Sequence, residues 1–221
     1  ADTIKGSDFL GDQDAVEIMA QEAPQRVYEL EHWGVPFSRI KEGLIAQRPF
    51  GGGAFPRTCY AADKTGHYLL HTLYEQSIKR RIPVYSEWVV TSLVVKEGGC
   101  KGVIAYHLPS GELEAFGAGA VIFATGGAGR IYNHSTNAII NTGAPMAVAY
   151  RAGVPLEDME FVQFHPTGLY GTDILITEGA RGEGGFLFNA QGERFMERYT
   201  PTAMELAPRD IVARSILTEV Q

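Results

Sequence analysis

A run of apolar residues that ends in a cluster of glycines constrains the fold of this chain more than any other feature. Residues Gly119 to Thr125 (GAVIFAT) are nearly all apolar, and Gly126-Gly127-Ala128-Gly129 follows directly. Such a run is typical of a strand buried on both faces of a parallel sheet. A buried strand that enters a glycine-rich turn is how doubly wound α/β sheets present backbone N–H groups to a nucleotide. By itself the turn fits both a nucleotide site and a plain strand-to-helix connection.

Other strands are expected just before this run. Three segments, VYSEWVVTSLVV, GCKGVIAYHLP and GELEAFGAGAVIFAT, are rich in β-branched and aromatic residues. The turn residues Glu97-Gly98-Gly99 and Ser110-Gly111 separate them, which is the usual punctuation between strands. The pattern predicts consecutive strands from Pro83 to Thr125.

Three segments have the pattern of helices. Asp12 to Trp33 is the longest, with Asp12 as a plausible N-cap, and Pro24 inside it predicts two helices or a kink. Ala61 to Arg81 has apolar residues at helical spacing, and Met146 to Ala152 reads as a short helix.

The character of the sequence changes after Gly153, where short segments, glycines and charged residues next to aromatic ones replace the strand pattern. We expect a domain transition near Leu156 to Gln163. The chain is thus predicted to consist of one domain at residues 1–155 and a second, α+β domain at residues 156–221.

Composition limits the class of partner. A formal net charge of −7 argues against nucleic acid, because neutralising phosphates requires a basic surface. Two cysteines, Cys59 and Cys100, without CxxC spacing indicate a reducing compartment. No signal peptide and no apolar run near the ~20 residues of a membrane span is present, so we expect a chain that does not itself cross a bilayer. His67 and His71 have metal-compatible spacing, but no third ligand is apparent and no metal is predicted.

The region from Phe161 to Arg209 carries the chemistry. It contains FVQFHPTG, LITEGARGEGG and ELAPRDIVAR, and so brings together an imidazole, a hydroxyl, a carboxylate and two guanidinium groups among glycines. A small dianion needs cationic and hydrogen-bonding groups at both ends, and proton transfer at carbon needs an acid or base held against it. The candidate residues are His165, Thr177, Glu178, Arg181 and Arg209.

At these blocks the chain resembles the flavoprotein subunit of succinate dehydrogenase and fumarate reductase. KGSDFLGDQDAVE, ELEHWGVPFSRI, QRPFGG, RTCYAADKTGHYLLHTLYE and FATGGAGRIY are similar to the same family in the same order. The resemblance implies part of a Rossmann-like FAD-binding domain followed by the start of an α+β capping domain. It also implies that the family's GxGxxG loop, the histidine that attaches FAD covalently and the second half of the subunit lie outside these 221 residues.

The resemblance implies a role for each candidate residue. His165 and Thr177 match residues that bind the dicarboxylate, and Arg209 matches the acid/base that exchanges a proton with the substrate carbon. Glu178 and Arg181 match residues that relay this proton to solvent. The simpler interpretations are a histidine that satisfies a turn, a strand threonine and a surface ion pair.

The resemblance also implies contacts with FAD. The backbone of the turn after the predicted buried strand, and the backbone after INTG, would approach the cofactor. These residues are Ala124, Thr125, Gly126, Gly127, Gly143 and Ala144. Ala144-Pro145 departs from the family's Asp-Gly, so a flavin-holding carboxylate and a backbone N–H are absent here. QRPFGGGAFPRT is also shorter than the family's loop.

The function implied is interconversion of succinate and fumarate with FAD. An iron–sulfur partner subunit and, through it, membrane anchor subunits are implied, at the cytoplasmic or matrix face of an inner membrane. L-Aspartate oxidase shares the HPTG, TEG and LAPRDIVAR-like blocks and is the alternative enzyme. A non-catalytic folded module is the alternative for the isolated 221 residues.

Overall fold

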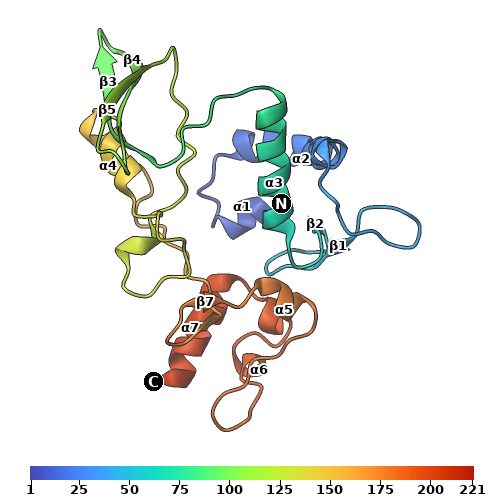
Figure 1. The fold of residues 1–221 in the computed structure, drawn as a ribbon. Coiled ribbons are helices and arrows are strands. Elements are labelled where there is room, and N and C mark those ends of the chain that lie inside the picture. The colour runs from blue at the N-terminus through green and yellow to red at the C-terminus, as the bar shows by residue number, and fades with distance from the viewer. The chain divides into compact units, whose positions relative to one another are not determined.

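The computed structural model describes all residues, 1–221, and the chain forms two compact units. Unit 1 contains residues 1–83, 164–167 and 176–221, and unit 2 contains residues 84–163 and 168–175. Figure 1 traces the chain through both. These units are groups of residues that contact one another, and they are not evidence for or against separate domains. The domains at residues 1–155 and 156–221 therefore remain a prediction.

Unit 1 is mainly helical. Its elements are α1 (Asp2–Gly6), α2 (Gln13–Trp33), β1 (Gln47–Arg48), β2 (Thr58–Cys59), α3 (Thr65–Lys79), α5 (Glu178–Gly182), α6 (Met196–Tyr199), the 3₁₀ helix η2 (Met204–Leu206) and α7 (Arg209–Val220). Helices α2 and α3 pack against each other, and β1 and β2 form a short antiparallel pair.

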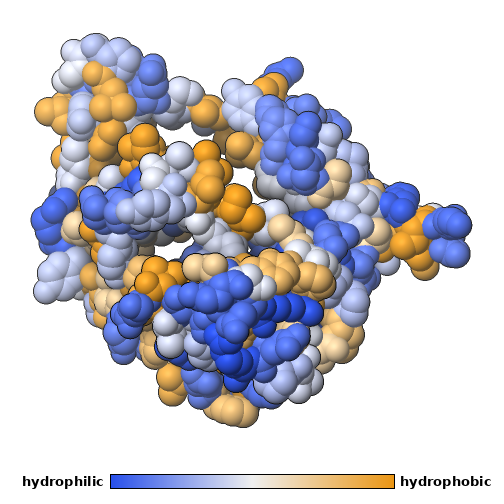
Figure 2. Space-filling view, turned by 90° about the horizontal axis from the view of Figure 1, so that it is seen from below, coloured by the Kyte–Doolittle hydropathy of each residue, from blue (hydrophilic) through white to orange (hydrophobic).

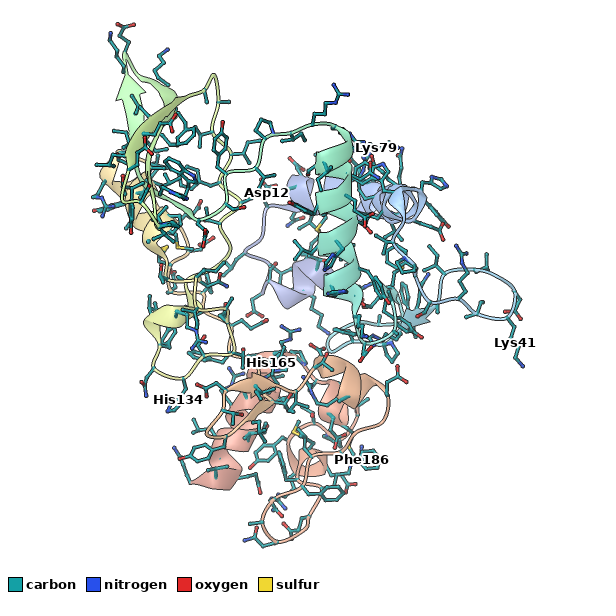
Figure 3. All side chains as sticks on the ribbon, in the orientation of Figure 1. Asp12, Lys41, Lys79, His134, His165 and Phe186 are labelled. Atoms are coloured by element: carbon teal, nitrogen blue, oxygen red, sulfur yellow. The ribbon has the colours of Figure 1, made fainter.

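Helix α2 begins where the sequence predicts. The Asp12 side chain accepts hydrogen bonds from the N–H groups of Asp14 and Ala15, which otherwise have no partner in the first turn. Asp12 is labelled in Figure 3. Of the two predicted alternatives, two helices or a kink, the first is wrong, because a single helix passes through Pro24. Pro24 removes one backbone hydrogen bond, but this helix has no fully buried residue, so water can reach the carbonyl that loses its donor.

Helix α3 confirms the second predicted helix but starts later. Ala61 to Lys64 form a turn, in which Ala61 N–H donates to Thr65 Oγ1, and the helix covers Thr65–Lys79. Arg80 caps its C-terminus and donates from Nη1 to the Gln76 carbonyl.

The buried core of unit 1 lies under its C-terminal helices. Met196 and Val212 are fully buried and pack with Phe195 and Ala207. Met196 belongs to α6 and Val212 to α7, so this cluster fixes one helix against the other. Arg209 is the first residue of α7 and is therefore carried on a packed element.

Unit 2 is built on a three-stranded antiparallel sheet. Its elements are β3 (Trp88–Lys96), β4 (Gly99–His107), β5 (Leu113–Gly117), η1 (Gly129–Ile131), α4 (Ala144–Arg151), β6 (Gly168–Leu169) and β7 (Ile174–Leu175). The sheet has the order β3-β4-β5, and α4 packs on β3. Glu97 and Gly98 connect β3 to β4 with positive φ angles of 54° and 73°, which is the geometry of a two-residue type I′ hairpin turn. The predicted strands before residue 118 are confirmed.

The strand predicted at Gly119–Thr125 is not present. The last bond to the sheet is from Ala118 N–H to the Lys101 carbonyl, and beyond it Ile122 is 89% exposed. A strand buried on both faces is typical of a parallel sheet, whereas every strand pair of this chain is antiparallel. The apolar run is real, but nothing in the chain pairs with it.

Helix α4 starts two residues before the predicted Met146. Gly143 precedes it in the left-handed conformation (φ 75°), and Pro145 occupies the first turn, where a missing N–H costs little. Ala144 and Pro145 are therefore well suited to begin a helix.

Large apolar side chains are exposed over much of the surface, as the orange residues of Figure 2 illustrate. Ile139, Ile140 and Tyr170 are each at least 80% exposed. Exposed apolar surface on this scale is typical of faces that pack against further protein. None of the helices has the length and apolar character needed to cross a membrane.

Candidate active site

Helix α5 carries three of the candidate residues. Thr177 is its N-cap, and the Thr177 Oγ1 accepts a hydrogen bond from Gly179 N–H at 3.3 Å. Glu178 and Arg181 follow, three residues apart, and are 4% and 5% exposed. Charged side chains are seldom buried to this extent without partners, so this short helix has a specific electrostatic environment.

The Glu178 carboxylate is held at both oxygens. Arg209 contacts Oε2 from Nε at 2.7 Å and from Nη2 at 2.6 Å, and the Gly51 N–H donates to Oε1 at 2.5 Å. Two guanidinium nitrogens on one carboxylate oxygen form a strong charge-assisted contact. The pair joins α5 to the start of α7, and it is not the surface ion pair between Glu178 and Arg181 that helical spacing alone suggests.

Arg181 lies within electrostatic reach of both members of this pair. Its Nη1 donates to the main-chain oxygen of Glu205 at 2.6 Å, whereas its Nε and Nη2 are buried without a hydrogen-bond partner. Burial lowers the pKa of Arg181, and the neighbouring Glu178 carboxylate opposes this effect. Unpaired buried donors on a guanidinium are costly unless an anion meets them.

Glu205, whose main-chain oxygen accepts the hydrogen bond from Arg181, has a buried side chain. Its side chain accepts from Arg194 at 2.9 and 2.6 Å and from Leu187 N–H at 3.3 Å, and the Arg194 guanidinium stacks on the Phe186 ring at 3.8 Å. Figure 3 labels Phe186 in this region. The Arg194 hydrogen bonds lower the pKa of Glu205, so its carboxylate stays ionised.

His165 lies in the short segment 164–167 of unit 1 and is labelled in Figure 3. Its Nδ1 is 3.2 Å from the Thr167 carbonyl oxygen and 3.3 Å from the Thr167 N–H, which leaves Nε2 as the ring nitrogen available to a ligand. Burial lowers the pKa of His165, and the charges of Arg209 and Arg181 lower it further. The imidazole is therefore neutral at pH 7.

The five candidate residues thus belong to one compact unit. His165, Thr177, Glu178, Arg181 and Arg209 all lie in unit 1, and the last three are linked by direct contact or by electrostatic influence. Sequence reasoning missed Gly51, Arg48 and Glu205. The glycine run in QRPFGGG was the available signal for Gly51, since a backbone that approaches a side chain closely requires glycine.

The candidate FAD contacts lie in unit 2. The backbone of residues 119–127 makes no hydrogen bond within the chain, and Gly126 has a φ of 71° that favours glycine. Free N–H groups on a glycine-rich segment fit the phosphates of a dinucleotide. Ala144 fits less well, because its N–H already donates to Thr142 Oγ1 at 3.3 Å and its side chain has no carboxylate.

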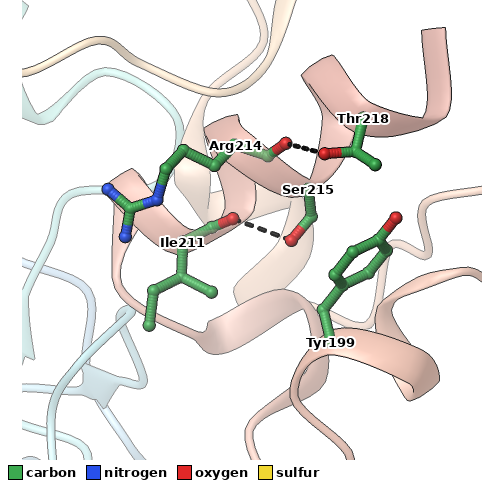
Figure 4. A pocket seen from close by; sticks show the side chains of 5 residues that line it. All are labelled: Tyr199, Ile211, Arg214, Ser215 and Thr218. Atoms are coloured by element: carbon green, nitrogen blue, oxygen red, sulfur yellow. Dashed lines mark hydrogen bonds between the residues drawn. The ribbon is translucent and has the colours of Figure 1, made fainter. Parts of the chain in front are cut away.

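A pocket in the surface is lined by none of these candidate residues. It measures about 190 Å³ and is lined by Tyr199, Ile211, Arg214, Ser215 and Thr218. Figure 4 shows why it is a poor site: the Ser215 and Thr218 hydroxyls donate to carbonyls of their own helix, at Ile211 and Arg214. The buried charged groups of α5, with their unpaired donors, are therefore the better candidate for the active site.

Comparison with known proteins identifies the family to which the chain belongs. A family profile described as "FAD binding domain" matches residues 1–221. The chain therefore belongs to the FAD binding domain family, and the predicted α/β FAD-binding fold class is confirmed.

Similar proteins include the flavoprotein subunits of two enzymes. The chain is 55% identical to the succinate dehydrogenase flavoprotein subunit of Rickettsia conorii, covering 100% of this chain and 38% of that protein. It is 50% identical to the fumarate reductase flavoprotein subunit of Mycobacterium tuberculosis, covering 99% of this chain and 39% of that protein. A solved E. coli quinol fumarate reductase FrdA variant superposes with a TM-score of 0.94 at 44% identity, covering 99% of this chain and 40% of that one. The resemblance expected from the sequence motifs is confirmed, and the chain spans about two fifths of the length of these relatives.

Proposed function

We propose that this chain is the dicarboxylate-binding and proton-transfer part of a flavoprotein subunit that interconverts succinate and fumarate. The observation that carries the proposal is the buried Glu178 carboxylate between Arg209 and the Gly51 N–H, with Arg181 and His165 beside it. Identity of 50–55% to succinate dehydrogenase and fumarate reductase flavoprotein subunits supports it. The chain covers 38% of the first of these relatives, so activity, substrate and partners of the whole protein are all part of the proposal.

Two residues bind the dicarboxylate in this proposal. His165 donates from Nε2 when its Nδ1 accepts the hydrogen bond from the Thr167 N–H. Thr177 Oγ1 accepts from Gly179 N–H, so the Thr177 hydroxyl proton is free to donate to a carboxylate. Binding both ends of the dianion fixes its middle carbons, which is the main contribution of positioning to such reactions.

Arg209, Glu178 and Arg181 move the proton. Arg209 exchanges it with the substrate carbon, and the Glu178 carboxylate takes it from or returns it to the guanidinium through the 2.7 and 2.6 Å contacts. An arginine, with an ordinary pKa above ~12, acts as an acid or base only when a partner shares its proton in this way. Arg181 then passes it toward solvent.

FAD, when bound, supplies the hydride chemistry at the neighbouring carbon. We assign its contacts to the backbone of Ala124, Thr125, Gly126 and Gly127 and to that of Gly143 and Ala144. Residues 1–155 then form part of the FAD-binding domain and residues 156–221 part of the capping domain. We further propose an iron–sulfur partner subunit and membrane anchors, at the cytoplasmic or matrix face of an inner membrane.

The test uses the full-length protein with its FAD. Thr177→Ala should raise KM for succinate about tenfold or more, since a charge-assisted hydrogen bond contributes about 1.5–3 kcal/mol. Thr218→Ala is the matched control, because the Thr218 hydroxyl donates to its own helix at Arg214. Unchanged KM and unchanged malonate inhibition in Thr177→Ala would contradict the assignment. Turnover of L-aspartate in place of succinate would favour L-aspartate oxidase.

A further inference from the structure

We propose that the segment Arg48–Gly51 is a positioning element for the proton relay and holds the Glu178 carboxylate where Arg209 can reach it. The inference rests on the proposed function, and it assigns a role to a loop far away in sequence from the reactive residues. The segment leaves β1 and runs along α5, where three close contacts fix its position.

The first contact is between Gly51 and Glu178. The Gly51 N–H donates to Oε1 at 2.5 Å, on the side of the carboxylate opposite Arg209. A Cβ at position 51 would lie 2.7 Å from Oε1 and 3.0 Å from the Ala207 carbonyl oxygen. Any side chain would therefore push the carboxylate or the main chain at 207 out of place. Gly52 N–H continues the attachment by donating to the Leu206 carbonyl at 3.1 Å.

The second contact is made by two glycines of α5. A Cβ at Gly179 would meet the Arg48 guanidinium at 3.2–3.4 Å, and a Cβ at Gly182 would meet the Pro49 carbonyl oxygen at 2.8 Å. Residues three apart share one face of a helix, so α5 presents a face without side chains to the segment. Glu178 and Arg181 flank these glycines and are oriented by this close approach.

The third contact fixes Arg48 itself. Its guanidinium lies over the Tyr60 ring at 4.6 Å and near the Phe50 ring at 5.4 Å from the ring centre. Its buried Nε has no hydrogen-bond partner. Stacking on two rings therefore holds the flat guanidinium against Gly179, next to the N–H that Thr177 caps.

The orientation of Glu178 therefore depends on the Gly51 N–H and on the packing of Arg48 against Gly179, and not on α5 alone. A helix of five residues is too short to be rigid by itself. The contacts with the segment Arg48–Gly51 hold α5 in place. Gly51 contacts Oε1 of Glu178, whereas Arg209 contacts Oε2, so Gly51 and Arg48 act through the position of Glu178 and are positioning residues.

The experiment compares two variants of the full-length protein with its FAD bound. In Gly51→Ala, the added methyl group should displace the Glu178 carboxylate from the N–H of residue 51, and kcat for succinate should fall about tenfold to hundredfold, as expected when one hydrogen bond to a charged group is lost. The Kd of malonate, a non-reactive dicarboxylate, should not change. The solvent deuterium isotope effect on kcat should rise, because proton transfer becomes more limiting. Arg48→Lys keeps the charge and loses the flat stacking face, and should show the same pattern with a smaller loss.

Two controls match these changes. Gly117→Ala adds a methyl group at a position with no atom within 4 Å, and Arg80→Lys alters a guanidinium that stacks on the Trp33 ring at 5.2 Å, away from α5. Both should retain wild-type kcat. If Gly51→Ala does not fold, Arg48→Lys alone decides, and a wild-type kcat and isotope effect in it overturn the inference.

A double variant separates positioning from general stability. When Glu178 is already changed to Gln, Gly51→Ala should cost no further activity if it acts through Glu178. An additive loss, or a weakened malonate Kd, overturns the inference and leaves the proposed function intact. A wild-type kcat in Glu178→Gln alone rejects the relay, and the positioning role with it.

Discussion

His165 is expected to take up a proton when a dicarboxylate binds beside it. In the free site, burial lowers the pKa of the imidazole below its ordinary value of 6.5, and Arg209 and Arg181 lower it further. The Thr167 hydrogen bond and the Glu178 charge oppose this depression without cancelling it. A bound dianion favours the imidazolium form, so the pKa of His165 rises on binding.

The size of the effect follows from the hydrogen bond that Nε2 would make. A hydrogen bond from neutral imidazole contributes about 0.5–1.5 kcal/mol, and one between charged groups about 1.5–3 kcal/mol. The difference of about 1–1.5 kcal/mol corresponds to roughly fivefold to tenfold tighter binding once His165 is protonated. The affinity should rise as the pH falls from the pKa of the bound state to that of the free state, and should be constant outside this window, where both states carry the same charge.

The measurement is the Kd of malonate in the full-length protein with its FAD, followed by flavin absorbance between about pH 6 and 8. His165→Gln is the control, because glutamine donates a hydrogen bond and does not titrate in this range. Protonation of malonate itself affects both proteins equally. The same pH dependence in wild type and His165→Gln would refute the reasoning.

Three more outcomes are expected. Arg209→Lys should lower kcat at least about a hundredfold while malonate still binds and an artificial donor still reduces the flavin, because lysine cannot place two nitrogens on Glu178; a wild-type kcat would make Arg209 an ion-pair residue only. Ala144→Asp should keep the fold and retain or tighten the flavin, since an acidic residue in the first turn of α4 is favourable by about 0.3–1 kcal/mol, and loss of flavin would contradict this. Met196→Ala should lower the free energy of unfolding by about 2–5 kcal/mol in urea titrations, because Met196 is fully buried, and an unchanged midpoint would contradict that cost.

Elements specified by local chemistry were predictable from the sequence. Asp12 caps α2, and the Glu97-Gly98 turn joins β3 to β4, because a capping carboxylate and a turn with positive φ depend on only a few neighbouring residues. The helix through Pro24 was not predictable by the same rules, since its tolerance depends on how exposed the helix is.

The segment Gly119–Thr125 marks the limit of pattern reasoning. Its apolar run indicates a buried strand. The sequence pattern does not show which other strands would pair with it, because pairing depends on tertiary contacts. In the structure it pairs with none, and Ile122 is 89% exposed.

The candidate site also has a part that was predictable from the sequence and a part that was not. The motifs that contain His165, Glu178 and Arg209 predict a dicarboxylate site because they resemble motifs of a known flavoprotein family. The role of Gly51 was not visible, because a backbone N–H has no side-chain signature and its partner lies 127 residues away. The Glu178–Arg181 spacing even suggested the wrong ion pair.

The hairpin turn between β3 and β4 has a consequence for the order in which the protein folds. Strands β3, β4 and β5 are consecutive, and each pairs with its neighbour through a short connection, so the sheet requires little loop-closure entropy.

The contact between Gly51 and Glu178 requires closure of a loop of 127 residues. Such contacts form late in folding, because the entropy cost of closing the loop must be met before the contact contributes any stabilising free energy. The β3-β4-β5 sheet should therefore gain amide protection early in refolding, and the Glu178 carboxylate should acquire its donor only after most of the chain has condensed around it. Assembly of the reactive centre then coincides with the completion of folding.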